Sequence, residues 1–277
     1  MISTLLVLVA GYGLLSFCLW RWQAHLIFYP TQTIGETPAD YGVAYEPVSI
    51  QLEHEGGIQN LDGWWLPGTA SKSKAILYLH GNGDNITIPT YVAQAVRMRN
   101  LGFSVLLFDY RGFGRSNGAF PSEVSVYEDA EYAWRYLLGR IGGTAKNAFI
   151  YGHSLGGAIA IEIAVRHPDA AGLVVESSFT SMRQMGRHFA VFGLFPVSSF
   201  LCHHFESIDK VSALKMPVLF IHGTKDLTVP CRMSQQLFAA APEPKQLLII
   251  PGGHHLDNAA VGGGKYLDVL RDFLSRN

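Results

Sequence analysis

Short runs of apolar residues recur along the chain, separated by polar and glycine-rich segments. Two runs, at 43–52 and 58–66, flank the turn signal Glu55-Gly56-Gly57. Apolar runs of this length, bounded by turn residues, predict strands. Six more predicted strands follow, at 75–80, 104–109, 147–151, 173–176, 217–222 and 246–250.

Helical patterns lie between or after most of these strands. We expect helices over 86–100 and 122–138, and helices that begin near Leu155, Cys231 and Ala260. Continuously apolar strands that alternate with helices are typical of a parallel sheet covered on both faces. The sequence therefore predicts an α/β fold.

The start signals of two of these helices differ in kind. Ser122 opens its helix with a Ser-x-x-Ser pattern, which is a weak capping signal. Asp84 and Asn85 precede another helix, and we expect their side chains to cap it.

One connection is longer than a simple crossover needs. Residues 179–212 separate two predicted strands and are rich in Phe, Met and His, including the pair His203-His204. We interpret this segment as a helical, cap-like insertion over the site.

The N-terminus differs sharply from the rest of the chain. Met1 to Trp20 contains no charged side chain, and a span of about 20 apolar residues matches the bilayer core. Trp20 and Trp22 flank Arg21, as interfacial anchors would. A cleaved signal peptide is the main alternative, but no basic region precedes the run and no clear cleavage site follows. We expect residues 1–22 to be a single-pass membrane anchor, followed by a loop over 28–41.

Composition and charge narrow the remaining possibilities. The 277 residues are 48% hydrophobic and 16% charged, with a net charge of −1. This fits one catalytic domain over 23–277 and lacks the basic character of a nucleic-acid binder. Arg21 is the only basic residue near either end of the anchor, which weakly favours a cytoplasmic body. Three scattered cysteines form no disulfide framework, and the composition leaves the oligomeric state open.

The chemistry centres on the pentapeptide Gly152-His153-Ser154-Leu155-Gly156. It is a G-x-S-x-G motif between a predicted strand and a predicted helix. A sharp strand-to-helix turn holds the serine hydroxyl clear of the backbone, and its glycines let neighbouring backbone pass closely. The motif predicts Ser154 as the nucleophile.

A serine nucleophile needs a histidine base and a carboxylate that orients the histidine. Asp226 follows the strand at 217–222, and His254-His255 follow the strand at 246–250. Functional side chains of parallel sheets gather beyond the carboxyl ends of the strands. We expect Asp226 to be the acid and His255 the base. Asp257 and Glu243 are alternatives for the acid, and His254 is the alternative for the base.

The oxyanion of an acyl-transfer reaction needs at least two donors. We expect the amides of Leu155 and Asn82 to supply them, with Gly83 as the alternative to Asn82. No cofactor is expected, because Gly112 to Gly118 does not fit a dinucleotide fingerprint and no Walker motif is present. No metal is expected either, since the adjacent His254 and His255 point apart in an extended chain.

Taken together, these motifs resemble the α/β-hydrolase superfamily of serine hydrolases, and especially its membrane-anchored BEM46-like branch. The resemblance covers nearly the whole chain and implies an eight-stranded, mostly parallel sheet with a Ser-Asp-His triad. At 252–257 a glycine is usual where His254 stands, and the catalytic histidine is aligned with His255. The other matching pieces, in order, are Phe28-Tyr29-Pro30, Leu61 to Pro67, His80-Gly81-Asn82-Gly83, Asp109 to Ser116, Gly152 to Gly157, Glu176 to Ser181 and His222 to Asp226.

The expected function is cleavage of a carboxylic ester or thioester through an acyl-enzyme, with a small or lipid-like acyl substrate. Some members of the branch are similar to thioesterases that remove palmitoyl groups from proteins. An acyltransferase or serine peptidase that uses the same triad is the first alternative. A catalytically silent binding protein on the same fold is the second.

Overall fold

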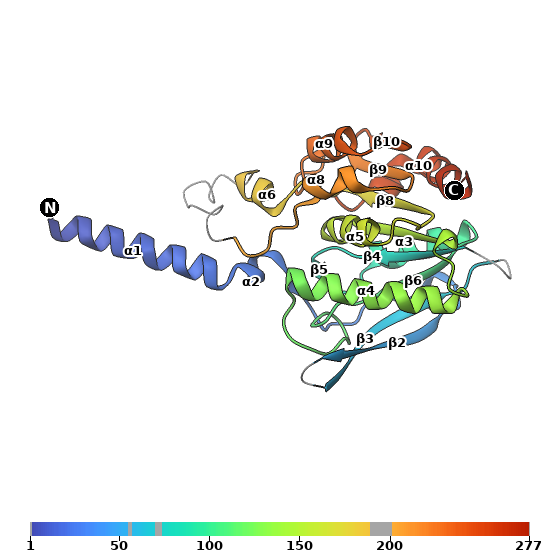
Figure 1. Ribbon diagram of the computed structural model, residues 1–277, viewed down its shortest axis with the longest axis horizontal. Coiled ribbons are helices and arrows are strands. Elements are labelled where there is room, and N and C mark those ends of the chain that lie inside the picture. The colour runs from blue at the N-terminus through green and yellow to red at the C-terminus, as the bar shows by residue number, and fades with distance from the viewer. Residues whose placement is uncertain (1, 55–56, 70–73, 189–200, 277) are drawn as a thin grey trace.

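An eight-stranded sheet forms the centre of the molecule in a computed structural model, which describes residues 2–54, 57–69, 74–188 and 201–276 (Figure 1). The strand order is β10-β9-β8-β7-β4-β6-β3-β2. Strand β3 is antiparallel to β2 and β6, and the other neighbours are parallel. The strands are β2 (Glu46–His54), β3 (Gly57–Leu66), β4 (Ala75–Leu79), β6 (Ser104–Phe108), β7 (Ala148–His153), β8 (Gly172–Glu176), β9 (Val218–Gly223) and β10 (Lys245–Ile250). The predicted fold class is confirmed, with strand ends that differ by at most a few residues.

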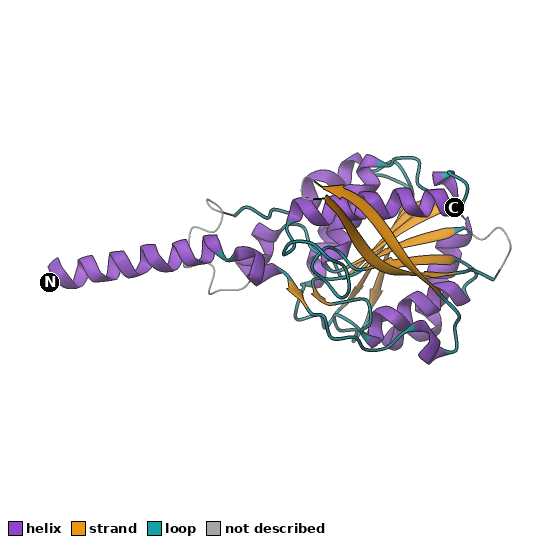
Figure 2. Cartoon of the chain, turned by 90° about the horizontal axis from the view of Figure 1, so that it is seen from below, coloured by secondary structure: helices purple, strands orange, loops and turns teal. Residues whose placement is uncertain are grey.

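Helices cover both faces of this sheet (Figure 2). Successive side chains of a strand point to opposite faces, so in β4 Leu77 and Leu79 join one core while Ile76 and Tyr78 join the other. The first core also contains α4 (Glu123–Arg140), α5 (Leu155–Arg166) and α9 (Cys231–Ala240), and the second contains α3 (Pro89–Asn100) and α10 (Asn258–Arg276). The central strands β4, β6, β7, β8 and β9 are buried on both faces, which explains why they are mostly apolar, and the edge strand β10 is partly exposed.

Two helix starts differ from the expectations. The Ser-x-x-Ser pattern at α4 is a complete capping box, because Ser122 and Ser125 each accept a hydrogen bond from the other's backbone N–H. The expected capping of α3 by Asp84 and Asn85 is wrong. Helix α3 begins later, at Pro89, whose fixed φ and missing N–H suit the first turn. Asn85 instead accepts a hydrogen bond from the N–H of Thr87.

The segment after the predicted anchor is more ordered than the expected loop. Its first residues form β1 (Tyr29–Pro30), which pairs in parallel with β5 (Gly83–Asp84) as a separate two-stranded sheet. A 3-10 turn, η1 (Pro38–Tyr41), follows. Strands of two residues are too short to show a pattern of apolar and polar positions. The loop expectation was therefore wrong at Tyr29–Pro30, where pairing with the distant β5 determines the structure.

The N-terminal helix extends away from the sheet and the helices that cover it (Figures 1 and 2). Helix α1 (Ile2–Arg21) is followed by the short α2 (Gln23–Ile27). The stretch Thr4–Arg21 is long and apolar enough to cross a membrane, and none of its residues is fully buried in the protein. Length and composition of this helix suit both a membrane anchor and a signal sequence.

The predicted insertion at 179–212 is helical at both ends. It contains α6 (Met182–His188), α8 (Ser207–Lys210) and the 3-10 turn η4 (Val211–Ala213). Its residues 189–200 lie outside the described residues. Another 3-10 turn, η2 (Ala145–Asn147), precedes β7.

Candidate active site

Ser154 stands on the turn between β7 and α5, in a backbone conformation that few residues adopt. Its φ is 56° and its ψ is −120°, a strained region for a residue with a Cβ. The turn is held from β8 and the segment after it. The N–H of Ser154 donates to the carbonyl of Glu176 (2.9 Å), and the hydroxyl of Ser178 donates to the carbonyl of Ser154 (2.8 Å). Neighbouring structure thus fixes the strained turn on both sides.

The glycines that flank this turn are required by close backbone packing. A Cβ on Gly156 would collide with the carbonyl oxygens of Leu79 and His80, and a Cβ on Gly152 would collide with Gly156. Both contacts let α5 start directly behind β4 and β7. The close approach expected from the motif is therefore present.

Three predicted residues meet at this edge of the sheet. The Oγ of Ser154 lies 2.9 Å from Nε2 of His255, and Nδ1 of His255 lies 2.7 Å from Oδ2 of Asp226. An ionised carboxylate only accepts hydrogen bonds, so Nδ1 of a neutral His255 carries the proton and Nε2 accepts from the serine hydroxyl. This arrangement can take the proton of Ser154 during an attack on a carbonyl.

Asp226 is held in its ionised form. Burial alone would raise its pKa, but hydrogen bonds from His222 and His255 outweigh burial and lower the pKa well below its usual value. The N–H groups of Thr228 and Val229 also donate to its Oδ1, at 2.9 and 2.8 Å. The buried side chain keeps its charge here because both of its oxygens have hydrogen-bond donors.

The alternative residues lie outside this relay. His254 is exposed, and its N–H donates to Oδ1 of Asp257 (2.6 Å). Glu243 accepts from the N–H of Lys245. Within the ranges given above, no cluster of three or more His, Cys, Asp or Glu side chains is arranged to hold a metal ion.

The two residues predicted to supply the oxyanion donors line the same cavity as Ser154. Leu155 is the first residue of α5, where the N–H has no partner within the helix and the helix dipole favours negative charge. Asn82 lines the same cavity, while its carbonyl accepts from the N–H of Tyr29 and its side chain donates to the carbonyl of Ile27. Gly83, the alternative, is in β5. The use of the Leu155 and Asn82 amides stays a prediction.

Two histidines at the site were missed by the sequence reasoning. Nε2 of His153 donates to the carbonyl of His255 (2.9 Å), and His222 lies 3.1 Å from Oδ2 of Asp226. Burial and the neighbouring His255 lower the pKa of His153 to about 4. The sequence offered one signal for each residue: His153 immediately precedes Ser154, and His222 lies four residues before Asp226.

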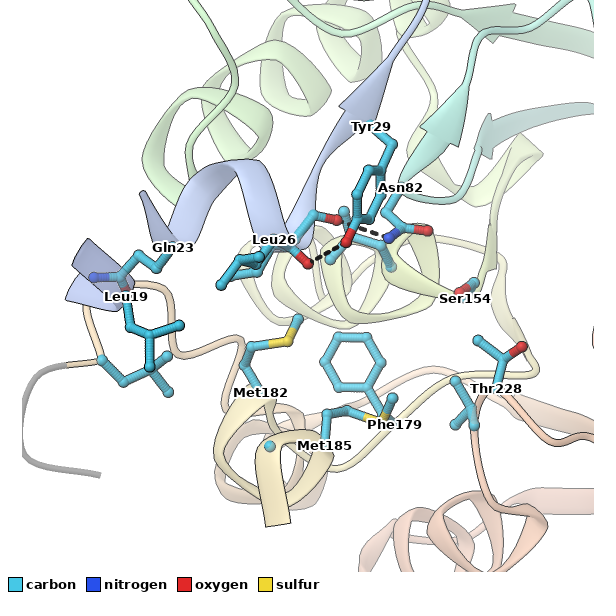
Figure 3. A pocket seen from close by; sticks show the side chains of 15 residues that line it. Leu19, Gln23, Leu26, Tyr29, Asn82, Ser154, Phe179, Met182, Met185 and Thr228 are labelled. Atoms are coloured by element: carbon cyan, nitrogen blue, oxygen red, sulfur yellow. Dashed lines mark hydrogen bonds between the residues drawn. The ribbon is translucent and has the colours of Figure 1, made fainter. Parts of the chain in front are cut away.

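A cavity of about 280 Å³ opens from Ser154 and is lined mainly by apolar side chains (Figure 3). Phe179, Met182 and Met185 enter it from the insertion, and Leu26 enters it from α2. The Ser154 hydroxyl therefore lies at an apolar cavity.

Comparisons with known proteins show the family to which the chain is related. The family model described as serine aminopeptidase, S33 (Hydrolase_4) matches residues 70–207. An uncharacterized protein of Mycobacterium tuberculosis is 35% identical over 99% of this chain and 94% of its own length. The uncharacterized membrane protein YNL320W of Saccharomyces cerevisiae is 30% identical over 92% of this chain and 90% of its own.

Solved structures share the fold at lower identity. A Pyrococcus furiosus esterase, Pf2001, matches with a TM-score of 0.74 and 21% identity, over 90% of this chain and 98% of that one. The full-length relatives, the matched family model and the eight-stranded sheet lead to one conclusion: the chain belongs to the α/β-hydrolase family, with bem46 of Schizosaccharomyces pombe (29% identical over 94% of this chain and 88% of its own) and YNL320W among its homologues.

Proposed function

We propose that this protein is a membrane-anchored serine hydrolase that cleaves carboxylic esters or thioesters with an apolar acyl group. The single observation that carries the proposal is the hydrogen-bonded series Ser154, His255 and Asp226 at the mouth of an apolar cavity. The esterase name of a structural neighbour supports the reaction class.

The proposed reaction has two stages. Oγ of Ser154 attacks the acyl carbonyl as its proton passes to Nε2 of His255, and the amides of Leu155 and Asn82 stabilise the oxyanion. The C–O or C–S bond then breaks, and the leaving alcohol or thiol takes the proton from His255. Water, activated by His255, hydrolyses the acyl-enzyme and releases the carboxylic acid with Ser154 restored.

The nature of the cavity favours an ester or thioester over an N-terminal peptide. An aminopeptidase binds a charged amino terminus, which requires an acceptor such as a carboxylate. The cavity side chains found in the described part of the chain include no Asp or Glu. Acyl transfer remains the second candidate on the same triad, and adding alcohols or amines to the assay separates it from hydrolysis.

A fluorophosphonate probe tests the serine chemistry directly. The full chain in detergent should be labelled, and Ser154→Ala should lose the label because the activated hydroxyl is gone. Ser49→Ala is the matched control, since Ser49 is exposed on β2. Equal labelling of Ser154→Ala and wild type would reject the proposal.

We also propose that α1 is retained as an anchor. Leu19 of α1 lines the same cavity as Ser154. Cleavage of a signal peptide at the end of the apolar run would remove this part of the cavity wall, so the contact favours retention of α1. The N-terminal residue of the membrane-bound protein, determined by mass spectrometry, should lie before Thr4. A mature protein that begins near Ala24 would contradict this.

The body is proposed to face the cytoplasm, because Arg21 follows the span. Protease should then reach it only from the cytoplasmic side of sealed vesicles. Digestion from the opposite side alone would reverse this orientation.

A further inference from the structure

The cavity at Ser154 is built in part from the N-terminal helices. Leu19 at the end of α1 and Leu26 of α2 line it together with Met182 and Met185 of α6. Figure 3 shows Ser154 at one end of this set, Leu26 and the two methionines in the middle, and Leu19 at the far end. An extended apolar chain attached to the serine would therefore run towards α1.

The N-terminal wall is fixed to the catalytic domain on both sides of the cavity. The side chain of Asn82 donates to the carbonyl of Ile27 (2.7 Å), and the N–H of Tyr29 donates to the carbonyl of Asn82 (2.9 Å). Towards the insertion, Gln23 accepts from the N–H of Cys202 (2.7 Å). Hydrogen bonds on both sides therefore attach α2 to the rest of the protein as part of the cavity wall.

The far end of the cavity meets the apolar surface of α1. Leu19 lies two residues before Arg21, the last residue of α1, and is half-buried. Further along the same helix, Leu14 is 66% and Leu8 is 65% exposed to the surroundings of the protein. In a membrane-anchored protein those side chains contact lipid, so the cavity begins where the bilayer ends.

We propose that the substrate is a long-chain acyl ester or thioester resident in the membrane, whose acyl chain lies along Leu26 and Leu19 and reaches Ser154 without crossing water. This inference rests on the proposed serine hydrolase function and specifies its substrate class. Leu26 and Leu19 then determine which chain lengths are accepted. A part of the protein that serves as an anchor is also a wall of the binding site.

Chain-length selectivity of the full-length protein tests this assignment. With p-nitrophenyl esters from butyryl to palmitoyl at equal mole fraction in mixed micelles, the wild-type protein should accept the palmitoyl ester, because the cavity from Ser154 to Leu19 can hold a long acyl chain. Leu26→Trp should lower the palmitoyl-to-butyryl ratio of kcat/KM at least tenfold. Leu19→Trp should penalise only the longest chains, because it fills the far end.

Leu14→Trp is the matched control, since it places the same side chain on the exposed surface of α1 and should leave the ratio at the wild-type value. If Leu26→Trp fails to fold, seen as lost fluorophosphonate labelling, Met185→Trp narrows the cavity from the opposite wall. Ratios in the cavity variants equal to the Leu14→Trp ratio would overturn the inference.

Dilution tests delivery through the bilayer. The protein and a palmitoyl ester are placed in the same phosphatidylcholine vesicles, which are then diluted tenfold at a fixed protein-to-lipid ratio. Turnover of the palmitoyl ester per protein should not change, because its concentration in the bilayer is unchanged. Turnover of the same total amount of a water-soluble butyryl ester should fall, because its concentration in the water is lowered. A tenfold loss with the palmitoyl ester would show delivery through water and overturn the inference.

The two proposals fail in different ways. Ester turnover that persists in Ser154→Ala removes the proposed function itself. Turnover that depends on Ser154 while chain-length selectivity ignores Leu26 and Leu19 removes only the inference about the membrane substrate.

Discussion

At the scale of single residues, histidines have three distinct positions around Ser154. His255 contacts the serine hydroxyl, His222 lies against Asp226, and His153 donates to the backbone of His255. Only His255 touches the serine oxygen that is proposed to react. His222 contacts Asp226, and His153 contacts the backbone of His255. We therefore expect the proposed chemistry to depend also on His153 and His222, which a triad motif does not include.

The adjacent histidines give the first prediction. His255→Ala should lower kcat by about 1000-fold or more, because the proton of Ser154 loses its acceptor. His254→Ala should keep most of the activity, since His254 is exposed and engages Asp257 through its backbone. Ester hydrolysis by the two variants decides the matter, and the opposite pattern would transfer the catalytic role to His254.

The second prediction concerns His153 as a positioning residue. Removing its hydrogen bond to the carbonyl of His255 in His153→Leu should lower kcat about tenfold, the value of one such bond. KM should stay near the wild-type value, because His153 is not among the residues that line the substrate cavity. His153→Gln retains an N–H donor and should recover most of the rate. Equal loss in both variants would indicate a packing role instead.

At the scale of elements, helix starts decide where the catalytic side chains stand. Helix α5 begins immediately after Ser154 because β8 fixes the turn before it, and α4 begins at a capping box formed by two serines. Helix α4 packs in the same core as α5. Its start therefore contributes to the stability of the layer behind the nucleophile.

The capping box gives the third prediction. Ser122→Ala should lower the free energy of unfolding by about 1 kcal/mol, because the N–H of Ser125 loses its acceptor. Thr144→Ala is the matched control, since Thr144 precedes η2 without a side-chain capping bond. Urea unfolding midpoints in detergent measure both, and equal midpoints would contradict a role for the Ser122 side chain.

At the scale of the whole molecule, the buried histidines couple stability to pH. Burial lowers the pKa of His80 to about 3, and burial with the neighbouring His255 lowers the pKa of His153 to about 4, from 6.5 in both cases. Between pH 6.5 and 4 the unfolded chain binds protons that the folded chain does not bind. Stability therefore falls as the pH falls through this range.

This linkage gives the fourth prediction. Each histidine should contribute a slope of about 1.4 kcal/mol per pH unit to the free energy of unfolding. His153→Gln should remove one of the two contributions between pH 6.5 and 4. The exposed His204 provides the control His204→Gln, which should leave the slope unchanged. Denaturant midpoints at several pH values measure the slopes, and an unaltered slope in His153→Gln would refute the linkage.

Local pattern was sufficient for most of the framework. The apolar runs marked all eight strands, because the central parallel strands are buried on both faces and the outer strands keep one apolar face towards the core. The positions of Ser154, Asp226 and His255 after strands predicted their meeting, since carboxyl ends of parallel strands share one edge. The sequence failed at Tyr29–Pro30 and at Asn85, whose partners lie about 50 residues away along the chain.

The sequence by itself determined the fold class, the nucleophile turn and the apolar N-terminal helix, because each follows from neighbouring residues and their periodicity. The sequence favoured His255 and kept His254 as the alternative, and the tertiary structure placed His255 against Ser154. Only the tertiary structure brought His153 and His222 to the site. It also placed Leu19 and Leu26 along the cavity. Such contacts depend on how distant elements pack, and local periodicity carries no information about that packing.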